Sequence, residues 1–327
     1  MLSNTNELIA LGFDIGGSTT KVGLVSRSGK ILAIKETSTD VETTGLDKFL
    51  EKLLGLLHVM QAQAGRPVIG VGGTFLGWID DARTGPFMCS NAPALHGFNL
   101  KKLLESEFGL PVVLNDDATA HALAEYNLGS GRGVRRFMSM AMGTGLGIAM
   151  IINGEPLRFT AGCIGDAGHI ILRPGGPPCS TGCKGCGEAL IGVAGIERLA
   201  LEKYGVFKPA REIITGTREE KDPVATEIIK EIGLYTGELL ASISHIFLPD
   251  LIALTGGTST AGQVLLNATK MRFEELVGDY HRKFSHMSDG YYSGVEIVLG
   301  SLRGETGVIG SVVELFEQEQ KVAFGNF

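Results

Sequence analysis

The stretch Asp14-Ile15-Gly16-Gly17-Ser18-Thr19-Thr20-Lys21 lies between two predicted strands, residues 8–14 and 21–26. Glycines at such a corner let main-chain N–H groups approach an anion, hydroxyl groups add donors, and a carboxylate at the strand end can hold a hydrated Mg²⁺. No helix follows the glycines, so the stretch is neither a Walker loop nor a Rossmann fingerprint. It predicts phosphate binding at a hairpin corner, with a hairpin that merely requires positive φ as the alternative.

A second hairpin of the same kind opens the other half of the chain. Predicted strands at residues 136–141 and 148–152 flank Gly143-Thr144-Gly145-Leu146-Gly147. Two such hairpins indicate duplicated lobes, and the alternation of strands and helices after each one indicates an α/β protein with mixed sheets.

The lobe boundary is expected near the helix that follows the first half. We assign residues 1–122 to an N-terminal lobe and residues 123–304 to a C-terminal lobe that contains a metal-binding loop at 169–188. The last helix, within residues 305–327, is expected to return to the first lobe.

Composition limits the function classes. The chain has 327 residues, of which 44% are hydrophobic, which excludes disorder and favours two cores over one. No run approaches the roughly 18 apolar residues of a membrane helix, and a signal peptide is missing, so a soluble cytoplasmic protein without a membrane partner is expected. With 29 Lys+Arg against 36 Asp+Glu and no basic block, no nucleic acid partner is expected.

A polar run, Asn115-Asp116-Asp117-Ala118-Thr119, follows an apolar strand and begins a helix. A carboxylate there faces the positive end of the helix dipole and stays ionised. Such a group can accept the proton of an acceptor hydroxyl during phosphoryl transfer. Plain helix capping is the alternative, and the local sequence alone favours it.

A cluster of cysteines gives a separate signal. Cys163, Cys179, Cys183 and Cys186 lie close together, and His169 stands between the first two. One imidazole and three thiolates, from His169, Cys179, Cys183 and Cys186, complete a tetrahedral structural Zn²⁺ site. A disulfide, a reactive thiol pair and an iron–sulfur cluster are the alternatives. Because a four-ligand site has no open position, the metal is expected to organise a loop.

Taken together, these motifs resemble the ROK family of glucokinase-like sugar kinases, a branch of the actin, hexokinase and Hsp70 ATPase superfamily. The resemblance extends over roughly residues 8 to 318. The residues that carry it, in order, are Asp14-Ile15-Gly16-Gly17, Asp117 with Glu125, Gly143-Thr144-Gly145, Gly168-His169, Gly185-Cys186-Gly187-Glu188 and Gly256-Gly257.

The resemblance implies an α/β fold of two ribonuclease-H-like lobes with the active site in the cleft between them. It also implies a homodimer and ATP as the donor, with Asp14 holding Mg²⁺ through water. The residues expected around ATP and its phosphates are Asp14, Gly16, Gly17, Ser18, Thr19, Gly143, Thr144, Gly145, Gly256 and Gly257.

On the acceptor side, the resemblance implies a hexose or N-acetylhexosamine. Asp117 is similar to the family's catalytic base, which takes the proton of a sugar hydroxyl, typically the 6-hydroxyl. His169 would ligate zinc and present its other nitrogen to the sugar, and Glu188 would bind ring hydroxyls. The expected sugar-binding residues are Gly77, Asp116, Asp117, Asp166, His169 and Glu188.

Four positions depart from the family pattern. Asp116 replaces the usual Asn, Asp166 the usual Glu, and Ala94 the Asn of a Pro-Asn-Leu loop, while Cys183 lies two positions after the usual cysteine, which would be at Thr181. A different register would make Asp116 the base, but the helix through Glu125 favours Asp117. An ionised Asp only accepts hydrogen bonds, so Asp116 changes the preferred hydroxyl arrangement.

Two other functions fit parts of the pattern. A sugar-responsive, non-enzymatic regulator would need a helix-turn-helix before the first glycine corner, and we expect none there. A partner-coupled ATPase of the superfamily could carry an iron–sulfur cluster on the cysteines. Polyphosphate is an alternative donor to ATP.

Overall fold

The computed structural model describes residues 7–89, 92–159, 163–302 and 304–324. The chain forms two compact units. Unit 1 comprises Met1–Gly129, Pro156–Gly165 and Leu302–Phe327, and unit 2 comprises Ser130–Glu155 and Asp166–Ser301.

Unit 1 is built on a five-stranded sheet with the order β3-β2-β1-β4-β7. β2 pairs antiparallel with β1 and β3, whereas β4 lies parallel to β1 and β7 parallel to β4. The first corner therefore belongs to a meander, as predicted. The strands are β1 (Ile9–Ile15), β2 (Thr19–Ser26), β3 (Ile31–Ser38), β4 (Val71–Phe75) and β7 (Val112–Asp116).

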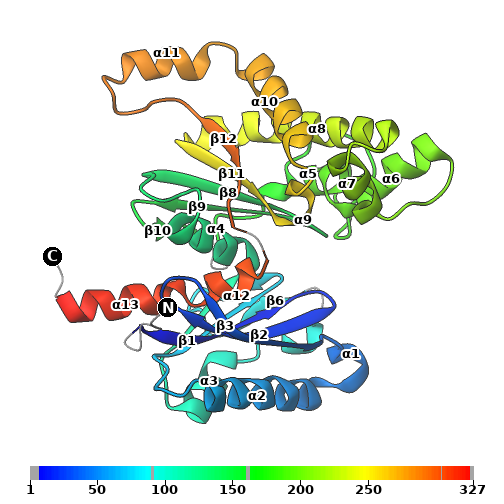
Figure 1. Cartoon of the computed structure of the whole chain (residues 1–327). Coiled ribbons are helices and arrows are strands. Elements are labelled where there is room, and N and C mark those ends of the chain that lie inside the picture. The colour runs from blue at the N-terminus through cyan, green and yellow to red at the C-terminus, as the bar shows by residue number, and fades with distance from the viewer. Residues whose placement is uncertain (1–6, 90–91, 160–162, 303, 325–327) are drawn as a thin grey trace. The chain divides into compact units, whose positions relative to one another are not determined.

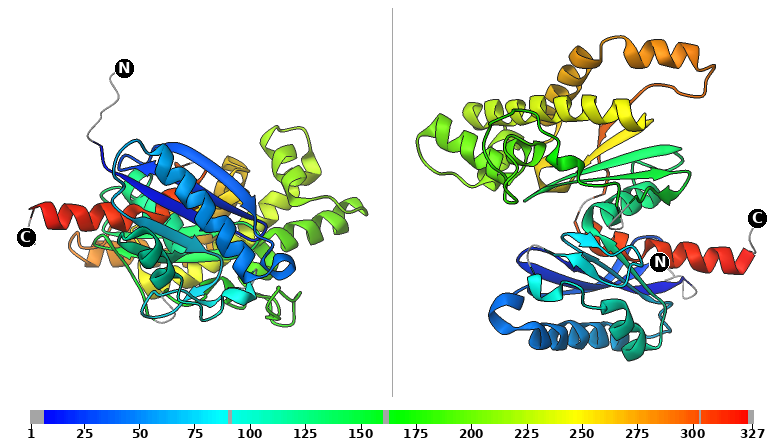
Figure 2. Two further views of the ribbon diagram at one scale, coloured as in Figure 1. Left: turned by 90° about the horizontal axis from the view of Figure 1, so that it is seen from below. Right: turned by 180° about the vertical axis from the view of Figure 1, so that it is seen from behind.

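The two faces of this sheet are covered by different helices. Side chains alternate along a strand, so Leu11 and Phe13 pack on α2 (Leu46–Gln63) and α3 (Leu100–Phe108), and Ala10 packs on the opposite face. Figures 1 and 2 show α2 and α13 on opposite faces. The helices of the second face are α4 (Asp117–Leu128), α12 (Thr306–Ser311) and α13 (Val313–Phe324).

Short elements complete unit 1. Gly77 precedes a two-stranded hairpin and has a φ of 129°, and a β-carbon there would overlap the main chain of Met88. Only glycine fits this position. The elements are α1 (Val41–Thr44), β5 (Trp78–Ile79), β6 (Pro86–Met88) and the 3₁₀ helix η1 (Pro93–Leu95).

Unit 2 repeats the plan with a five-stranded sheet in the order β10-β9-β8-β11-β12. β8 pairs antiparallel with β9 and parallel with β11, which pairs parallel with β12. The same sequence of pairings in both sheets agrees with the predicted duplication. The strands are β8 (Arg136–Met142), β9 (Leu146–Ile152), β10 (Glu155–Pro156), β11 (Leu251–Thr255) and β12 (Glu296–Leu299).

In unit 2 the helices α8 and α10 pack closely against each other. Gly233 and Gly237 on the long helix α8 let the main chain of α10 approach, because a β-carbon at either position would overlap α10. The elements are η2 (Ala167–His169), α5 (Gly187–Ile191), α6 (Val193–Tyr204), α7 (Ala210–Arg218), α8 (Pro223–Phe247), α9 (Gly256–Ser259), α10 (Gln263–Val277) and α11 (Tyr280–Met287).

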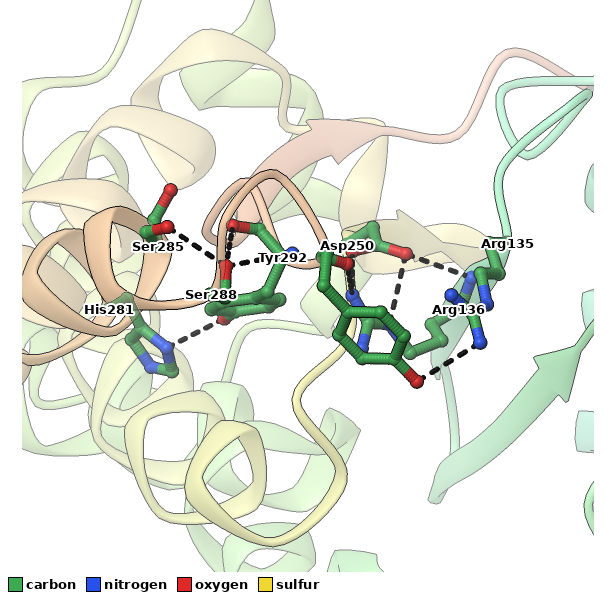
Figure 3. A network of polar contacts seen from close by, with 8 residues as sticks. Arg135, Arg136, Asp250, His281, Ser285, Ser288 and Tyr292 are labelled. Atoms are coloured by element: carbon green, nitrogen blue, oxygen red, sulfur yellow. Dashed lines mark hydrogen bonds and ion pairs between the residues drawn. The ribbon is translucent and has the colours of Figure 1, made fainter.

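A polar network fixes α11 and the segment after it to the sheet (Figure 3). The main-chain N and Nε of Arg136 each donate to Asp250 Oδ2 at 3.1 Å, which joins the start of β8 to the start of β11. The hydroxyl of buried Tyr292 lies 2.7 Å from Nδ1 of His281, and Ser244 Oγ lies 3.0 Å from its Nε2. Arg136 Nη2 also donates to the main-chain oxygen of Tyr291 at 3.3 Å, which joins the segment after α11 to the sheet.

Several expected boundaries need correction. The predicted lobe boundary after residue 122 is wrong because α4 runs unbroken to Leu128 and packs on α12, so unit 1 extends to Gly129. Pro156–Gly165 also belongs to unit 1. The expected closing helix is two helices, α12 and α13, and residues 325–327 lie outside the described residues.

Among the helices in the described part of the chain, none is both long and apolar enough to cross a membrane.

Candidate functional site

Three carboxylates gather at one edge of the unit 1 sheet. β1, β4 and β7 run parallel, so their carboxyl ends meet at the same edge. Asp14 lies near the end of β1, Asp116 ends β7, and Asp117 begins α4. This arrangement brings together the predicted Mg²⁺-binding residue and the predicted base.

The surroundings disfavour charge on these carboxylates. Burial raises the pKa of Asp14 to about 6, with Lys21 opposing the shift and Glu305 adding to it. Burial also raises the pKa of Asp117 to about 8, and the charges of Asp116 and Asp14 add to this effect. In the free protein Asp117 therefore holds its proton at neutral pH and is mostly ionised only above about pH 8, contrary to the expectation that the helix dipole keeps it ionised.

Helix capping, the alternative explanation of this polar run, is performed by Asp116. Its Oδ1 accepts a hydrogen bond of 2.8 Å from the main-chain N of Thr119, in the arrangement of an N-cap. Its Oδ2 is buried without a hydrogen-bond partner in the described structure. Asp117 is the first helical residue, so it is not the N-cap.

The first glycine corner is closed by a hydrogen bond of 3.1 Å from Gly16 N to Thr19 O. Gly17 and Ser18 at the tip of this corner are exposed. Beside it, Lys21 Nζ pairs with Glu305 Oε2 at 2.6 Å. The exposed tip leaves N–H and hydroxyl groups available to an anion.

In unit 2 the second glycine corner lies against Gly256. Gly143 N donates to Gly145 O at 3.0 Å, which closes the corner. Gly256 has a φ of 79°, and a β-carbon there would overlap the main chain of Met142. The structure therefore brings together the two glycine segments that we predicted around the nucleotide in this half.

Glu188 lies next to the same corner. Its Oε1 accepts a hydrogen bond of 3.2 Å from Ser180 Oγ, and its Oε2 lies 3.4 Å from the main-chain N of Leu146. A β-carbon on Gly145 would lie 2.8 Å from Oε2, so the absence of a side chain at residue 145 leaves space for this carboxylate.

The predicted zinc ligands converge. The ligand atoms of His169, Cys179 and Cys183 lie within 4.8 Å of one another. Nδ1 of His169 lies 3.6 Å from Cys179 Sγ and 3.5 Å from the buried Cys186 Sγ. A tetrahedral zinc ion places nitrogen and sulfur ligands about 3.6 Å apart, so the distances from His169 to Cys179 and to Cys186 fit Zn²⁺, and His169, Cys179 and Cys183 form a group of three that could hold it.

A tight turn brings Cys183, which lies two positions after the usual cysteine of the family pattern, close to Cys179. Gly182 N donates to Cys179 O at 3.1 Å and Cys179 N donates to Cys183 O at 2.8 Å. Gly182 has a φ of 93°, which allows this turn. The Thr181 hydroxyl, at the position where the family has its cysteine, lies 3.1 Å from Cys179 Sγ.

His169 uses its two nitrogens differently. While Nδ1 faces the sulfurs, Nε2 lies 3.3 Å from Asp166 Oδ2. Burial raises the pKa of Asp166, and the nearby imidazole opposes that shift. The residues predicted to bind sugar in unit 2, namely Asp166, His169 and Glu188, are therefore close to the cysteine cluster.

Sequence reasoning missed a buried ionic cluster in unit 1 formed by Arg83, Arg158 and Glu314. Glu314 stands in an apolar helical pattern, and a charge at such a position was the available signal. No sequence pattern connects the two arginines to it.

The duplicated meander and parallel strands place the protein in the actin and hexokinase class of two-lobed α/β proteins. The sequence matches the ROK family model over residues 10–318. The chain belongs to the ROK family. A glucokinase of Halalkalibacterium halodurans is 30% identical, with 97% of both chains covered.

Solved structures of the family agree with this assignment. A ROK hexokinase from Thermus thermophilus is 26% identical with a TM-score of 0.78, over 96% of this chain and 100% of that one. A ROK family glucokinase from Streptomyces griseus, solved in complex with glucose and AMPPNP, is 28% identical with a TM-score of 0.75, over 95% and 99% of the two chains.

Proposed function

We propose that this carbohydrate kinase transfers the γ-phosphoryl group of ATP to the 6-hydroxyl of a hexose or N-acetylhexosamine. One observation supports this most directly. Asp117 stands at the sheet edge beside Asp14, its pKa is raised to about 8, and the capping role falls on its neighbour Asp116.

Asp117 is the general base. A base works best when its pKa lies near the working pH, because part of it is then ionised and it is still basic enough to accept the proton. Asp117 accepts the hydroxyl proton as the sugar oxygen attacks phosphorus. Burial of the carboxyl and its like-charged neighbours Asp116 and Asp14 make it basic enough for this task.

The glycine corners bind the donor. Gly16, Gly17, Ser18 and Thr19 of unit 1 contribute N–H and hydroxyl donors to the phosphates. Unit 2 contributes Gly143, Thr144 and Gly145, together with Gly256 and Gly257. Asp14 would hold a hydrated Mg²⁺, and such an ion would supply positive charge to the phosphoryl oxygens.

The acceptor contacts Gly77, Asp116, Asp166, His169 and Glu188. Zn²⁺ on His169, Cys179, Cys183 and Cys186 has a structural role, because four protein ligands leave no open coordination position. Zinc bound at Nδ1 would fix the ring of His169, whose Nε2 lies 3.3 Å from Asp166 Oδ2. We also propose that the protein forms a homodimer. Light scattering, which measures the mass of the purified protein in solution, tests this.

A coupled assay of ADP release over a panel of hexoses and N-acetylhexosamines tests the activity. We expect at least one sugar to stimulate turnover, and its 6-deoxy analogue to give none. Inorganic polyphosphate in place of ATP tests the donor. If no sugar raises ADP release, or if a 6-deoxy sugar is phosphorylated, the proposal is wrong.

Substitution of the base provides a second test. We expect Asp117→Ala to lower kcat by at least about 1000-fold, because the hydroxyl then lacks both its base and its orientation. Glu51→Gln, on the exposed face of α2, is the control and should retain full activity. An Asp117→Ala enzyme with near-normal kcat would remove Asp117 from the mechanism.

A further inference from the structure

The ionic cluster in unit 1 is made by side chains from separate parts of the chain. Arg83 follows β5, Asn115 belongs to β7, Arg158 lies in Pro156–Gly165, and Glu314 belongs to α13. Glu314 Oε2 accepts from Asn115 Nδ2 at 2.7 Å and from Arg83 Nη2, and Oε1 accepts from Arg83 Nη1 at 3.2 Å. Arg158 Nη2 lies 3.3 Å from the same Oε1.

The cluster forms hydrogen bonds with the last residues of β7. Asn115 Oδ1 accepts from Nη2 of Arg158 at 2.9 Å and from Nη2 of Arg83 at 3.0 Å. Arg83 Nε donates to the main-chain oxygen of Leu114 at 2.8 Å. Two guanidinium groups therefore hold the residues that directly precede Asp116 and Asp117.

The charges within the cluster do not balance. It contains two guanidinium groups and one carboxylate, and water reaches little of them, since the side chains of Arg83, Arg158 and Glu314 are 24%, 22% and 11% exposed. An excess charge in such a place is costly unless a counter-charge is near.

Asp116 can supply that counter-charge. It is 4% exposed, and its Oδ2 has no hydrogen-bond partner in the described structure. Nε of Arg158 is also buried without a partner there. Burial raises the pKa of Asp116, and the hydrogen bonds from Thr119 and, to a smaller extent, the positive charge of Arg158 oppose that rise.

We propose that Arg158 is a positioning residue: together with Arg83, Glu314 and Asn115 it compensates the buried carboxylate of Asp116 and thereby fixes the strand end that carries Asp117. Arg158 touches neither reacting group and acts through Asp116 and Asn115. Arg158 and Asp116 share no hydrogen bond or ion pair in the described structure, so their pairing is a compensation of charge across space. The catalytic part of this inference rests on the proposed function of Asp117, whereas this pairing does not.

A thermal double-mutant cycle on the full chain tests the pairing without any substrate. Arg158→Met keeps the length of the side chain and removes its charge, and Asp116→Asn removes the opposite charge. We expect Arg158→Met to lower the Tm by about 5 °C when residue 116 is Asp, and by less than about 2 °C when it is Asn. Arg211→Met, on the exposed surface of α7, should leave the Tm unchanged.

Kinetics with the sugar found in the panel test the positioning role. We expect Arg158→Met to lower kcat about 30-fold with the KM for ATP unchanged, because only the acceptor-side base is displaced. Arg158→Lys retains the charge but loses the planar fork, and should recover part of kcat. In the Asp116→Asn background, Arg158→Met should lower kcat less than about 3-fold.

Equal losses of Tm in the two backgrounds would overturn the pairing. Coupling in Tm without coupling in kcat would overturn the positioning role. A wild-type chain that no sugar stimulates would reject the proposed function, and the Tm cycle would still decide whether Arg158 and Asp116 are paired.

Discussion

The main chain of Gly307, in α12, lies directly against the carboxylate of Asp14, and a β-carbon at residue 307 would overlap Oδ2. The position of a residue at the end of β1 is therefore set by a helix from the other end of the sequence. Because Gly307 has no positive φ, the requirement for glycine here concerns space rather than backbone conformation.

Gly307→Ala should displace the Asp14 carboxylate. A shift of about 1 Å in such a group lowers activity about 100-fold, so we expect kcat/KM to fall by that order. Gly55→Ala is the control, because Gly55 lies in α2 with open space around it, and it should raise the Tm slightly while preserving activity. Full activity in Gly307→Ala would show that the carboxylate can move without effect.

The activity should depend on pH through Asp117. The base must be ionised to accept a proton, and its pKa in the free protein is raised to about 8. We therefore expect kcat/KM to rise with pH and to level off above about 8. A profile that is flat between pH 6 and 9 at saturating Mg²⁺ would contradict a rate-limiting role for this ionisation.

The same shift predicts an effect on stability. A carboxyl whose pKa is raised on folding binds its proton more tightly in the folded state. Its contribution to the free energy of unfolding is therefore fully present below the unfolded pKa of 3.8 and is lost as the pH rises through about 8. Asp117→Asn removes this loss. Its Tm should exceed that of the wild type at pH 9 and differ little at pH 4.

Local patterns were sufficient to predict much of the fold. The sequence predicts helices over residues 46–63, 100–108 and 223–247, and these coincide with α2, α3 and α8, because each helix has an apolar stripe and a clear stop or cap. The helices α5, α6, α7 and α11 were not predicted, since short, polar or glycine-containing helices are fixed by contacts made elsewhere. The apolar residues at 68–71 predict a strand, but β4 begins only at Val71.

The candidate site shows the same division. Motif order was enough to bring together Asp14 and Asp117, and likewise Gly143 and Gly256. The ionic cluster could not be predicted, because Arg83, Arg158 and Glu314 are distant in sequence and are joined only by the packing of α13 and by Asn115 of β7.

The position of Cys183 leads to a prediction about zinc. We expect the wild type to bind about one zinc per chain and Cys183→Ser to lose most of it, with a lower Tm. Thr181→Cys in the Cys183→Ser background should restore zinc, because the Thr181 hydroxyl lies 3.1 Å from Cys179 Sγ. Thr181→Ser is the control. Zinc that stays bound in Cys183→Ser would exclude Cys183 as a ligand.

Glu188 provides the last prediction. Its Oε1 accepts a hydrogen bond from Ser180 Oγ, and its Oε2 lies near the main-chain N of Leu146. These contacts orient the carboxylate beside the second glycine corner. Glu188→Gln keeps the shape but removes the charge that strengthens hydrogen bonds from sugar hydroxyls. We expect the KM for the sugar to rise about 10-fold to 100-fold with the KM for ATP nearly unchanged. Ser180→Ala, which removes one support and no charge, should raise the KM for the sugar less than about 5-fold. An increase confined to the KM for ATP would instead place Glu188 on the donor side.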